Sequence, residues 1–371
     1  MQTGSSFYEW LQIEIQAQGL LLRFQRILIN DCIKFLQFMT YRFSVGIDVS
    51  KATVDVALLD STQPEIVHHS KFTNSEAGVN DLLHWLESVP GFEQQKAIFC
   101  MEATGLYCHT LTEQLQQNNM AIWIENSVQI KRSMGIQRGK DDKTDAMRIA
   151  RYACKNQERI RLWKPVRAVV EKIKHLATLR ERLVQTQKKL LTPIEEMKAS
   201  GDASLARLLE KSIQKSIAAI EKDLKRIEAE ILSLIEKDES LNKLYLLITS
   251  VVGIGFVTAV NLIVHTNEFT SLNDSRKLAC YCGVAPFVHQ SGSSIRGKTR
   301  VHPMANKKLK TNLHMASLTA VKLDYDLKTY YNRKVAEGKS KLSVLNAVKC
   351  KMLARVVAVV NKQTPYVKKT A

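Results

Sequence analysis

The sequence predicts an α/β domain with a mixed sheet, then a long helical arm, and finally a mostly helical C-terminal domain. Three patterns predict this order. Short runs of β-branched and apolar residues alternate with helical patterns over residues 43–160, as in an α/β sheet. Leu and Ile recur at heptad-like spacing among Lys, Glu and Arg over residues 165–247. Apolar helical patterns return over residues 248–371.

The composition is that of a globular chain with an anionic partner. The 371 residues are 45% hydrophobic, which is enough for a sizeable core in two or three domains. The net charge of +18 is large for an enzyme, and nucleic acid is the simplest partner for it. A ribosomal-type or membrane-surface protein would share this composition. The seven Cys residues form no CxxC pair, which supports neither a disulfide framework nor a zinc site, and we expect a reducing, cytosolic setting.

Residues 1–42 form an N-terminal extension that is apolar and compatible with a helix. It lacks the basic opening and the small-residue cleavage site of a signal peptide. Met39 lies just before the first predicted strand. We expect the working domain to begin there, and the extension to be either a packing helix or an upstream start. No apolar run reaches the length that crosses a bilayer, so we expect no membrane contact.

The N-terminal domain, residues 43–160, opens with two predicted strands over residues 43–60. Residues 65–74 can add a third antiparallel strand, and residues 75–89 follow as a helix with a Ser cap. The remaining elements are a strand at 96–102, a helix, a strand at 121–126 and a helix over 138–155.

Two acidic residues mark one edge of this predicted sheet. Asp48 interrupts the first strand, and Glu102 ends the fourth. A carboxylate inside a buried strand must be paired or bind a cation. If the sheet places these strands side by side, the two carboxylates converge at an edge where ligands commonly bind. The alternative is that Asp48 caps the turn that follows.

Two further acids open the helix that ends this domain. Asp142 and Asp145 are three residues apart and share a helix face, whereas Asp141 points elsewhere. Either acid could instead be a helix cap or a partner of the helix dipole. Four carboxylates repel one another unless a cation binds, and Mg²⁺ or Mn²⁺ is the usual choice. Two such ions can activate a nucleophile and stabilise the leaving oxygen of a phosphodiester.

Residues 165–247 predict two long helices broken near residues 199–202. The simplest arrangement is an antiparallel coiled-coil arm that dimerises the protein or spaces two domains. We expect the arm to carry no chemistry.

The C-terminal domain contains Gly253-Ile254-Gly255 between two helical patterns. This resembles a helix-hairpin-helix turn, in which backbone N–H groups hold a phosphate. A plain helix-helix turn is the equal alternative. A short helix follows within residues 271–286, and an amphipathic helix over residues 342–363 closes the domain.

Residues 289–316 are rich in Ser, Lys and Arg. The run Gly292–Thr299 matches a phosphate-loop pattern, but Pro303 disfavours the helix that such a loop requires. The serines could instead bring a hydroxyl nucleophile to a phosphate backbone, although a basic, solvated loop is the plainer interpretation. The residues expected to contact nucleic acid are Lys51, Arg138, Lys140, Gly253, Gly255, Arg296, Lys298, Arg300, Lys307, Lys308 and Lys310.

These motifs together resemble a known family. GIDVSK with Asp48, MEATG with Glu102, and KDDKTDA with Asp142 and Asp145 resemble the Asp-Glu-Asp-Asp signature of insertion sequence family 110 transposases. The N-terminal domain of that family is similar to RuvC-like resolvases of the RNase H fold. VVGIGFVTA, GVAPFVHQSGSSIRGK and KLKTNLHMAS resemble the second domain of the family. The likeness runs from about Ser44 to the C-terminal helix.

The resemblance implies roles that the residue pattern alone does not. A serine before a glycine, in a PxxxxSG context, is the DNA nucleophile of the family, and Ser291 matches it, with Ser293 and Ser294 as further candidates. The resemblance implies a composite site in which carboxylates and serine come from different domains, across subunits of a dimer or tetramer. It also implies element ends and target DNA as substrates, a structured guide RNA, and a bacterial, nucleoid-associated protein.

Other functions remain open at this point. A RuvC-like endonuclease would use the four carboxylates to activate water and need no serine. An actin-like ATPase or sugar kinase shares the opening strand pair, but it needs phosphate-binding loops that the sequence lacks. A non-catalytic nucleic-acid-binding protein with a coiled-coil interface is the third alternative. Replacing Asp48 and Ser291 separately with Ala distinguishes these classes.

Overall fold

The structure is a computed structural model that describes residues 41–103, 105–133, 141–291 and 295–367. Most of the N-terminal extension lies outside the described residues. The chain divides into two compact units, residues 1–165 and residues 166–371.

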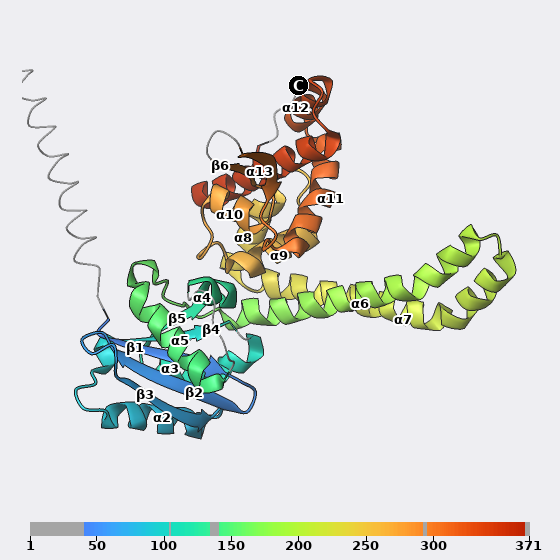
Figure 1. The fold of residues 1–371 in the computed structure, drawn as a ribbon. Coiled ribbons are helices and arrows are strands. Elements are labelled where there is room, and N and C mark those ends of the chain that lie inside the picture. The colour runs from blue at the N-terminus through green and yellow to red at the C-terminus, as the bar shows by residue number, and fades with distance from the viewer. Residues whose placement is uncertain (1–40, 104, 134–140, 292–294, 368–371) are drawn as a thin grey trace, which may run out of the picture. The chain divides into compact units, whose positions relative to one another are not determined.

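The first unit is an α/β unit with a five-stranded mixed sheet in the order β3-β2-β1-β4-β5 (Figure 1). β1 pairs antiparallel with β2 and parallel with β4, as the sequence predicts for a mixed sheet. The strands are β1 (Phe43–Val49), β2 (Thr53–Asp60), β3 (Val67–Thr73), β4 (Ala97–Glu102) and β5 (Ala121–Glu125). The helices are α2 (Glu76–Ser88), α3 (His109–Gln117), α4 (Ser127–Ser133) and α5 (Asp142–Lys155).

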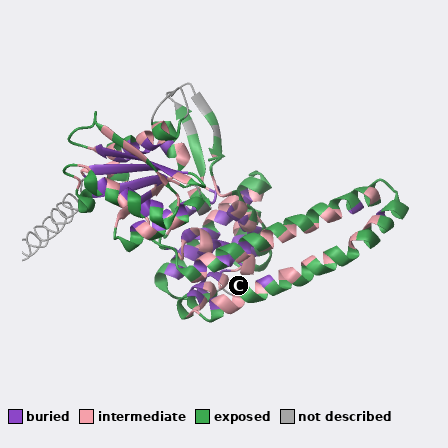
Figure 2. Ribbon diagram, turned by 90° about the horizontal axis from the view of Figure 1, so that it is seen from below, coloured by how far each residue is buried: buried purple, intermediate pink, exposed green. Residues whose placement is uncertain are grey.

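Alternation along the strands gives the sheet two buried faces, because successive side chains of a strand point to opposite sides. Phe43, Val45 and Ile47 of β1 pack in one cluster with apolar residues of α2 and α3. The opposite face is covered by α5. The three central strands, β1, β2 and β4, are accordingly almost entirely buried, whereas the edge strand β3 is half-buried or exposed (Figure 2).

Gly46 allows α5 to lie directly on β1. A Cβ at this position would overlap the backbone of Ala146 and Ala150. Ala57, which pairs with Gly46 on β2, packs with the same two alanines. Small residues on both elements therefore let helix and strand backbones approach closely.

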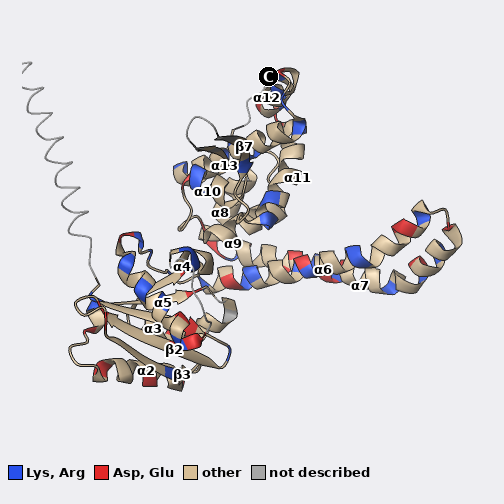
Figure 3. Cartoon of the chain, in the orientation of Figure 1, with Lys and Arg blue, Asp and Glu red and all other residues tan. Residues whose placement is uncertain are grey.

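The second unit begins with a helical hairpin formed by α6 (Ala168–Ala199) and α7 (Ala203–Glu236) (Figure 1). Its ion pairs show that the helices are antiparallel, since Lys172 pairs with Glu230 and Lys198 with Glu210. The break falls at the predicted place, where Gly201 has φ +86° and Asp202 caps α7. Basic and acidic residues are interspersed along both helices (Figure 3).

The base of this hairpin packs into a helical core. Val170 and Ile173 of α6 and Ile231 and Ile235 of α7 belong to one large apolar cluster. The other helices of this unit are α8 (Glu239–Thr249), α9 (Phe256–Thr266), α10 (Ser275–Tyr281), α11 (Lys307–Leu323), α12 (Tyr325–Ala336) and α13 (Lys341–Lys362). The arm helices end at Glu236, earlier than the predicted boundary at residue 247, because Asp238 caps α8 and turns the chain into the core.

The basic segment after Pro286 is more ordered than the predicted loop. β6 (Pro286–Ser291) and β7 (Ile295–Val301) form a two-stranded antiparallel sheet, and Asn306 caps α11 shortly after. Because Lys298 and Thr299 lie within β7, no helix starts there, which agrees with the rejection of a nucleotide-binding loop.

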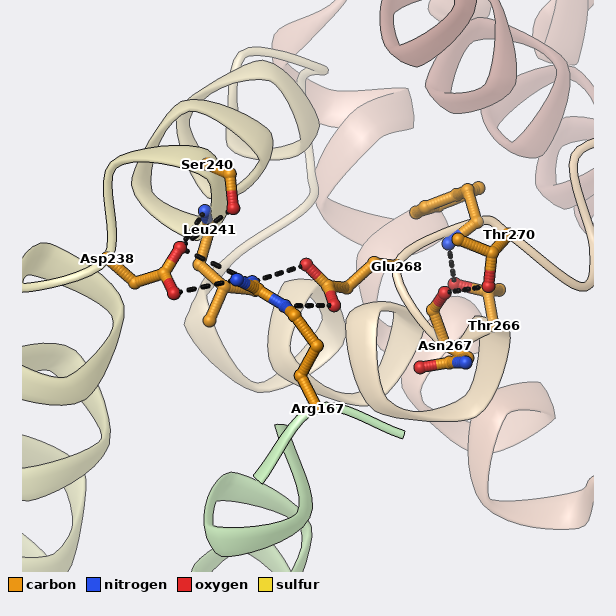
Figure 4. A network of polar contacts seen from close by, with 9 residues as sticks. Arg167, Asp238, Ser240, Leu241, Thr266, Asn267, Glu268 and Thr270 are labelled. Carbon is orange, nitrogen blue, oxygen red and sulfur yellow. Dashed lines mark hydrogen bonds and ion pairs between the residues drawn. The ribbon is translucent and has the colours of Figure 1, made fainter. Parts of the chain in front are cut away.

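Arg167 connects three segments of the second unit (Figure 4). Its guanidinium donates to Asp238, between α7 and α8, and to Glu268, which follows α9. Asn267, Glu268 and Phe269 all have positive φ, between 47° and 62°. The hydroxyl of Thr266 accepts from the N–H of Phe269 at 2.9 Å and holds this turn. None of the helices in the described part of the chain is long and apolar enough to cross a membrane.

Candidate catalytic carboxylate site

The sheet brings Asp48 and Glu102 together. The parallel pairing of β1 with β4 places Ile47 opposite Met101, and Asp48 and Glu102 are the next residues on these two strands. Asp48 also pairs directly with Asp55 of β2. Since paired residues point to the same face, all three carboxylates lie on the face that α5 covers.

The first turn of α5 carries Asp142 and Asp145. Gly46 fixes the height of this helix on β1, two residues before Asp48, so the first turn lies over the end of the strand that carries Asp48. Asp141 occupies the N-cap position and makes no side-chain capping hydrogen bond. The two acids therefore belong to the helix and face the strand carboxylates.

The surroundings of Asp48 raise the pKa of its carboxyl group. This pKa rises from 3.8 to about 6, first because burial penalises the charged form and then because Asp145, Asp142, Glu102 and Asp55 add negative charge. Burial and the charge of Asp145 also raise the pKa of Glu102, while Lys131 opposes this shift. A bound cation would relieve this repulsion at Asp48.

The sequence interpretation missed part of this arrangement. The strand pairings align one charged residue from every strand in a single row on the α5 face: Lys71, Asp55, Asp48, Glu102 and Glu125. We call these five residues the charged row. Alternation along each strand shows which residues share a face with Asp55 or with Glu125. Only the register between strands, which the structure supplies, places these two acids on the same face as Asp48.

Basic side chains contact Asp55 of the charged row and both acids of α5. The carboxylate of Asp55 is buried, with Nε2 of His69 and Nζ of Lys71 each 3.1 Å from its oxygens. The same Nζ of Lys71 lies 3.8 Å from Asp142. Arg148 forms an ion pair with Asp145 one turn along α5, and the hydroxyl of Tyr152 donates to Glu125.

The oxygen donors suit a hard divalent cation, but they do not form a complete cage. Among residues 41–103, 105–133, 141–291 and 295–367, no three Asp, Glu, His or Cys side chains gather closely enough to hold one metal ion. Magnesium at phosphoryl-transfer sites is commonly held by one or two carboxylates plus substrate phosphates and water. Asp48 with Glu102, or with an acid of α5, fits that mode of binding.

Ser291 is the last residue of β6, opposite Ile295. The structure describes its backbone but not its side chain, and the same holds for Arg296 and Lys298. Arg138, Lys140, Ser293 and Ser294 lie outside the described residues.

The remaining basic candidates differ in exposure. Lys51 is exposed in the turn between β1 and β2, and Arg300 and Lys307 are exposed in the second unit. Lys308 forms an ion pair with Glu181 of α6, and Lys310 is half-buried.

The two glycines of the predicted phosphate-binding turn have different surroundings. Gly253 has φ +93°, and a Cβ there would overlap the carbonyl of Ala316 and crowd Ala320, so close packing against α11 requires glycine at this position. Gly255, the N-cap of α9, has open space around it.

Comparison with known proteins identifies the family. One transposase family model matches residues 45–197, and a second, described as transposase IS116/IS110/IS902 family, matches residues 245–332. The pilin gene-inverting proteins of Moraxella bovis and Moraxella lacunata are each 27% identical over 329 residues, which cover 88% of this chain and 98% of theirs. The insertion element IS110 uncharacterized 43.6 kDa protein of Streptomyces coelicolor is 31% identical over 134 residues, 36% of this chain and 32% of that protein.

The two family matches cover both units, in the order in which the acidic signature and the second set of motifs occur along the chain. The resemblance found in the sequence is thereby confirmed: the chain belongs to the IS110 family of transposases, enzymes that act on DNA.

Proposed function

We propose that this transposase cuts and rejoins DNA with a serine nucleophile and divalent cations, each bound by one or two of the carboxylates of Asp48, Glu102, Asp142 and Asp145 together with DNA phosphates. One observation carries the metal site. The parallel pairing of β1 with β4, beneath the first turn of α5, gathers carboxylates from three elements onto one face, and burial together with these neighbouring charges raises the pKa of Asp48 to about 6. A cation relieves that repulsion, and DNA phosphates supply its remaining ligands.

The serine chemistry conserves the energy of the phosphodiester bond. Oγ of Ser291 forms a bond to phosphorus as the bond between phosphorus and the leaving strand oxygen breaks. The serine proton passes to a base in the site, and the leaving oxygen takes up a proton. In the reverse direction, the hydroxyl of a new strand attacks the phosphoserine ester and regenerates the serine. Bound Mg²⁺ or Mn²⁺ would stabilise negative charge on the phosphate oxygens.

The partners proposed here are the element ends, target DNA and a structured guide RNA. The net charge of +18 supports polyanion binding, and Arg300 and Lys307 are exposed at or near the β6–β7 hairpin. The name of the Moraxella relatives refers to gene inversion, a recombination of DNA, and these relatives align over 98% of their length. This coverage supports recombination, rather than cleavage alone, as the reaction.

We propose that the site is completed across subunits of a dimer or tetramer in which the α6–α7 hairpin acts as a coiled coil. Leu179 and Leu208 are 46% and 63% exposed on this hairpin. Exposed leucines on long helices favour a helical partner.

Trapping a protein–DNA adduct tests the proposed serine. The full-length protein and its Ser291→Ala, Ser293→Ala and Asp48→Asn variants are incubated with element-end DNA and Mg²⁺, and the attached residue is mapped. We expect an adduct on Ser291 that Ser291→Ala and Asp48→Asn lose and Ser293→Ala retains. Cleavage without an adduct in Ser291→Ala would indicate a water-using nuclease, and full activity of both Ser291→Ala and Asp48→Asn would indicate a binding protein. Asp81→Asn, an exposed acid of α2, is the control for the charge change.

A further inference from the structure

Lys71 connects the charged row to the first turn of α5. It lies on β3, an edge strand of the sheet, directly opposite Asp55 of β2. Its Nζ is 3.1 Å from Asp55 and 3.8 Å from Asp142. The side chain is 49% exposed, and that of Asp142 is 60% exposed. The contact between them is therefore one that solvent, or another cation, can replace.

Asp55 holds the other side of this contact firmly. Its side chain is 7% exposed, and both of its basic partners, His69 and Lys71, come from β3. A buried carboxylate that lost such partners would bear an uncompensated charge. Lys71 therefore stays at Asp55 even when Asp142 is engaged elsewhere.

We infer that Lys71 is a resident counter-cation of the carboxylate site: it neutralises Asp142 in the metal-free protein and is displaced from it when a divalent cation binds. This inference rests on the proposed metal role of Asp142. Lys71 is thus a positioning residue, acting on the metal through Asp142. Because Asp55 keeps the ammonium group of Lys71 close to the site, the positive charge of Lys71 also repels the incoming metal ion.

Two consequences follow for metal loading. The protein alone binds the metal more weakly than its carboxylates would without Lys71. DNA phosphates add negative charge and oxygen ligands, which favour the metal over the single ammonium. Loading is therefore coupled to the arrival of the substrate.

Calorimetric titration of Mn²⁺ into the full-length, DNA-free protein tests this inference. Lys71→Met removes the ammonium and keeps the length of the side chain, and Lys71→Arg restores the charge. Lys96→Met is the matched control, because Lys96 pairs with Glu93 before β4, at the other end of that strand from Glu102. Asp48→Asn reports whether the metal binds at the proposed site.

We expect Lys71→Met to bind Mn²⁺ about five- to tenfold more tightly, with the modest size set by the half-exposed contact. Lys71→Arg and Lys96→Met should bind as the unmodified protein does. The inference fails if Lys71→Met binds with equal or lower affinity while Asp48→Asn abolishes binding, and the proposed metal site then stands. If Asp48→Asn has no effect on Mn²⁺ binding, the metal site and the inference both fail. Thermal unfolding in EDTA checks that each variant folds.

Discussion

At the scale of single residues, the metal binding proposed for Asp48 is in conflict with the stability of the fold. Its pKa of about 6 means that the folded protein disfavours the charged form that a metal requires. Between pH 3.8 and about 6 the folded state binds more protons at this residue than the unfolded state does. The contribution of Asp48 to the free energy of unfolding therefore falls as pH rises through this window and stays low above it.

Asp48→Asn should accordingly stabilise the metal-free protein while abolishing DNA cleavage. At pH 8 we expect the first unit to gain about 1–2 kcal/mol in free energy of unfolding, after allowance for partial solvent screening. The gain should vanish below about pH 3.8, where Asp48 is protonated in both the folded and the unfolded state. Urea unfolding in EDTA at the two pH values measures this. A loss of stability at pH 8 would mean that burial and the neighbouring acids do not destabilise the charged form of Asp48.

Metal binding should depend on pH for the same reason. Because the cation requires ionised Asp48, the apparent Mn²⁺ affinity should rise as pH increases through about 6 and level off above pH 7. Titrations between pH 5 and pH 8 measure this. An affinity constant across that range would assign the metal to carboxylates other than Asp48.

The sequence indicated Asp48, Glu102, Asp142 and Asp145 as one group, because each acid stands out against an apolar run or opens a helix. It could not indicate Asp55 as a neighbour. Which residues meet across a sheet depends on register, and a single sequence carries that only through alternation. The contact of Lys71 with Asp142 was not predictable either, because it depends on where α5 lies along the sheet.

At the scale of the elements, the contact between α5 and β1 positions the acids proposed to bind the metal. Gly46→Ala should separate them, because its Cβ overlaps the backbone of α5. We expect a loss of about 2–3 kcal/mol in stability of the first unit, together with loss of cleavage. Gly255→Ala, which enters open space, should cost well under 1 kcal/mol. Thermal unfolding compares the two variants, and equal losses of stability would contradict the role given to Gly46.

The contacts of Arg167 stabilise the start of α6. Arg167→Met leaves Asp238 and Glu268 without their guanidinium partner, and we expect a cost of about 1–2 kcal/mol at low salt and less at high salt. Arg226→Met is the control, because Arg226 is 79% exposed and its pair with Asp223 should contribute little.

Hydrogen bonds and Arg167 lower the pKa of Asp238 to about 2. The stabilisation is therefore complete above pH 4 and is lost as pH falls toward 2. Thermal unfolding at several salt concentrations and pH values measures both effects. An Arg167→Met cost that is independent of salt would point to packing instead of charge.

Element prediction succeeded where periodicity was strong and failed where it was hidden. The break between α6 and α7 and the helix α13 follow the predicted positions closely. The β6–β7 hairpin was missed, because glycines, serines and basic residues obscure the period-2 pattern over residues 286–301. Phe287 and Arg300, for example, are paired across the two strands, so that an apolar and a charged side chain share one face of the hairpin.

At the scale of the whole molecule, we expect DNA association and DNA cleavage to respond to different conditions. EDTA should abolish DNA cleavage and leave DNA association in place, whereas added salt should weaken association steeply. Arg300→Ala should reduce the slope of log affinity against log salt by about one, and Lys334→Ala, whose lysine pairs with Glu337, should not change it. Fluorescence anisotropy with labelled DNA measures both. Cleavage that persists in EDTA would remove the metal from the mechanism.

The order of the fold classes along the chain was predictable because each class has its own hydrophobic period. The boundary of the two units at residue 165 falls where the α/β pattern gives way to heptads. Subunit assembly was not predictable to the same degree, since a heptad pattern specifies a helical partner without specifying whether it lies in the same chain.

The charged row also affects how the enzyme can misfold. A slip of one residue in any strand would turn its ionic side chain toward the apolar cluster beneath and its aliphatic neighbours toward α5. Such a misaligned sheet would be unstable, because it buries a charged side chain and exposes apolar side chains. Correct strand alignment therefore also brings Asp48 and Glu102 side by side, before α5 adds its two acids.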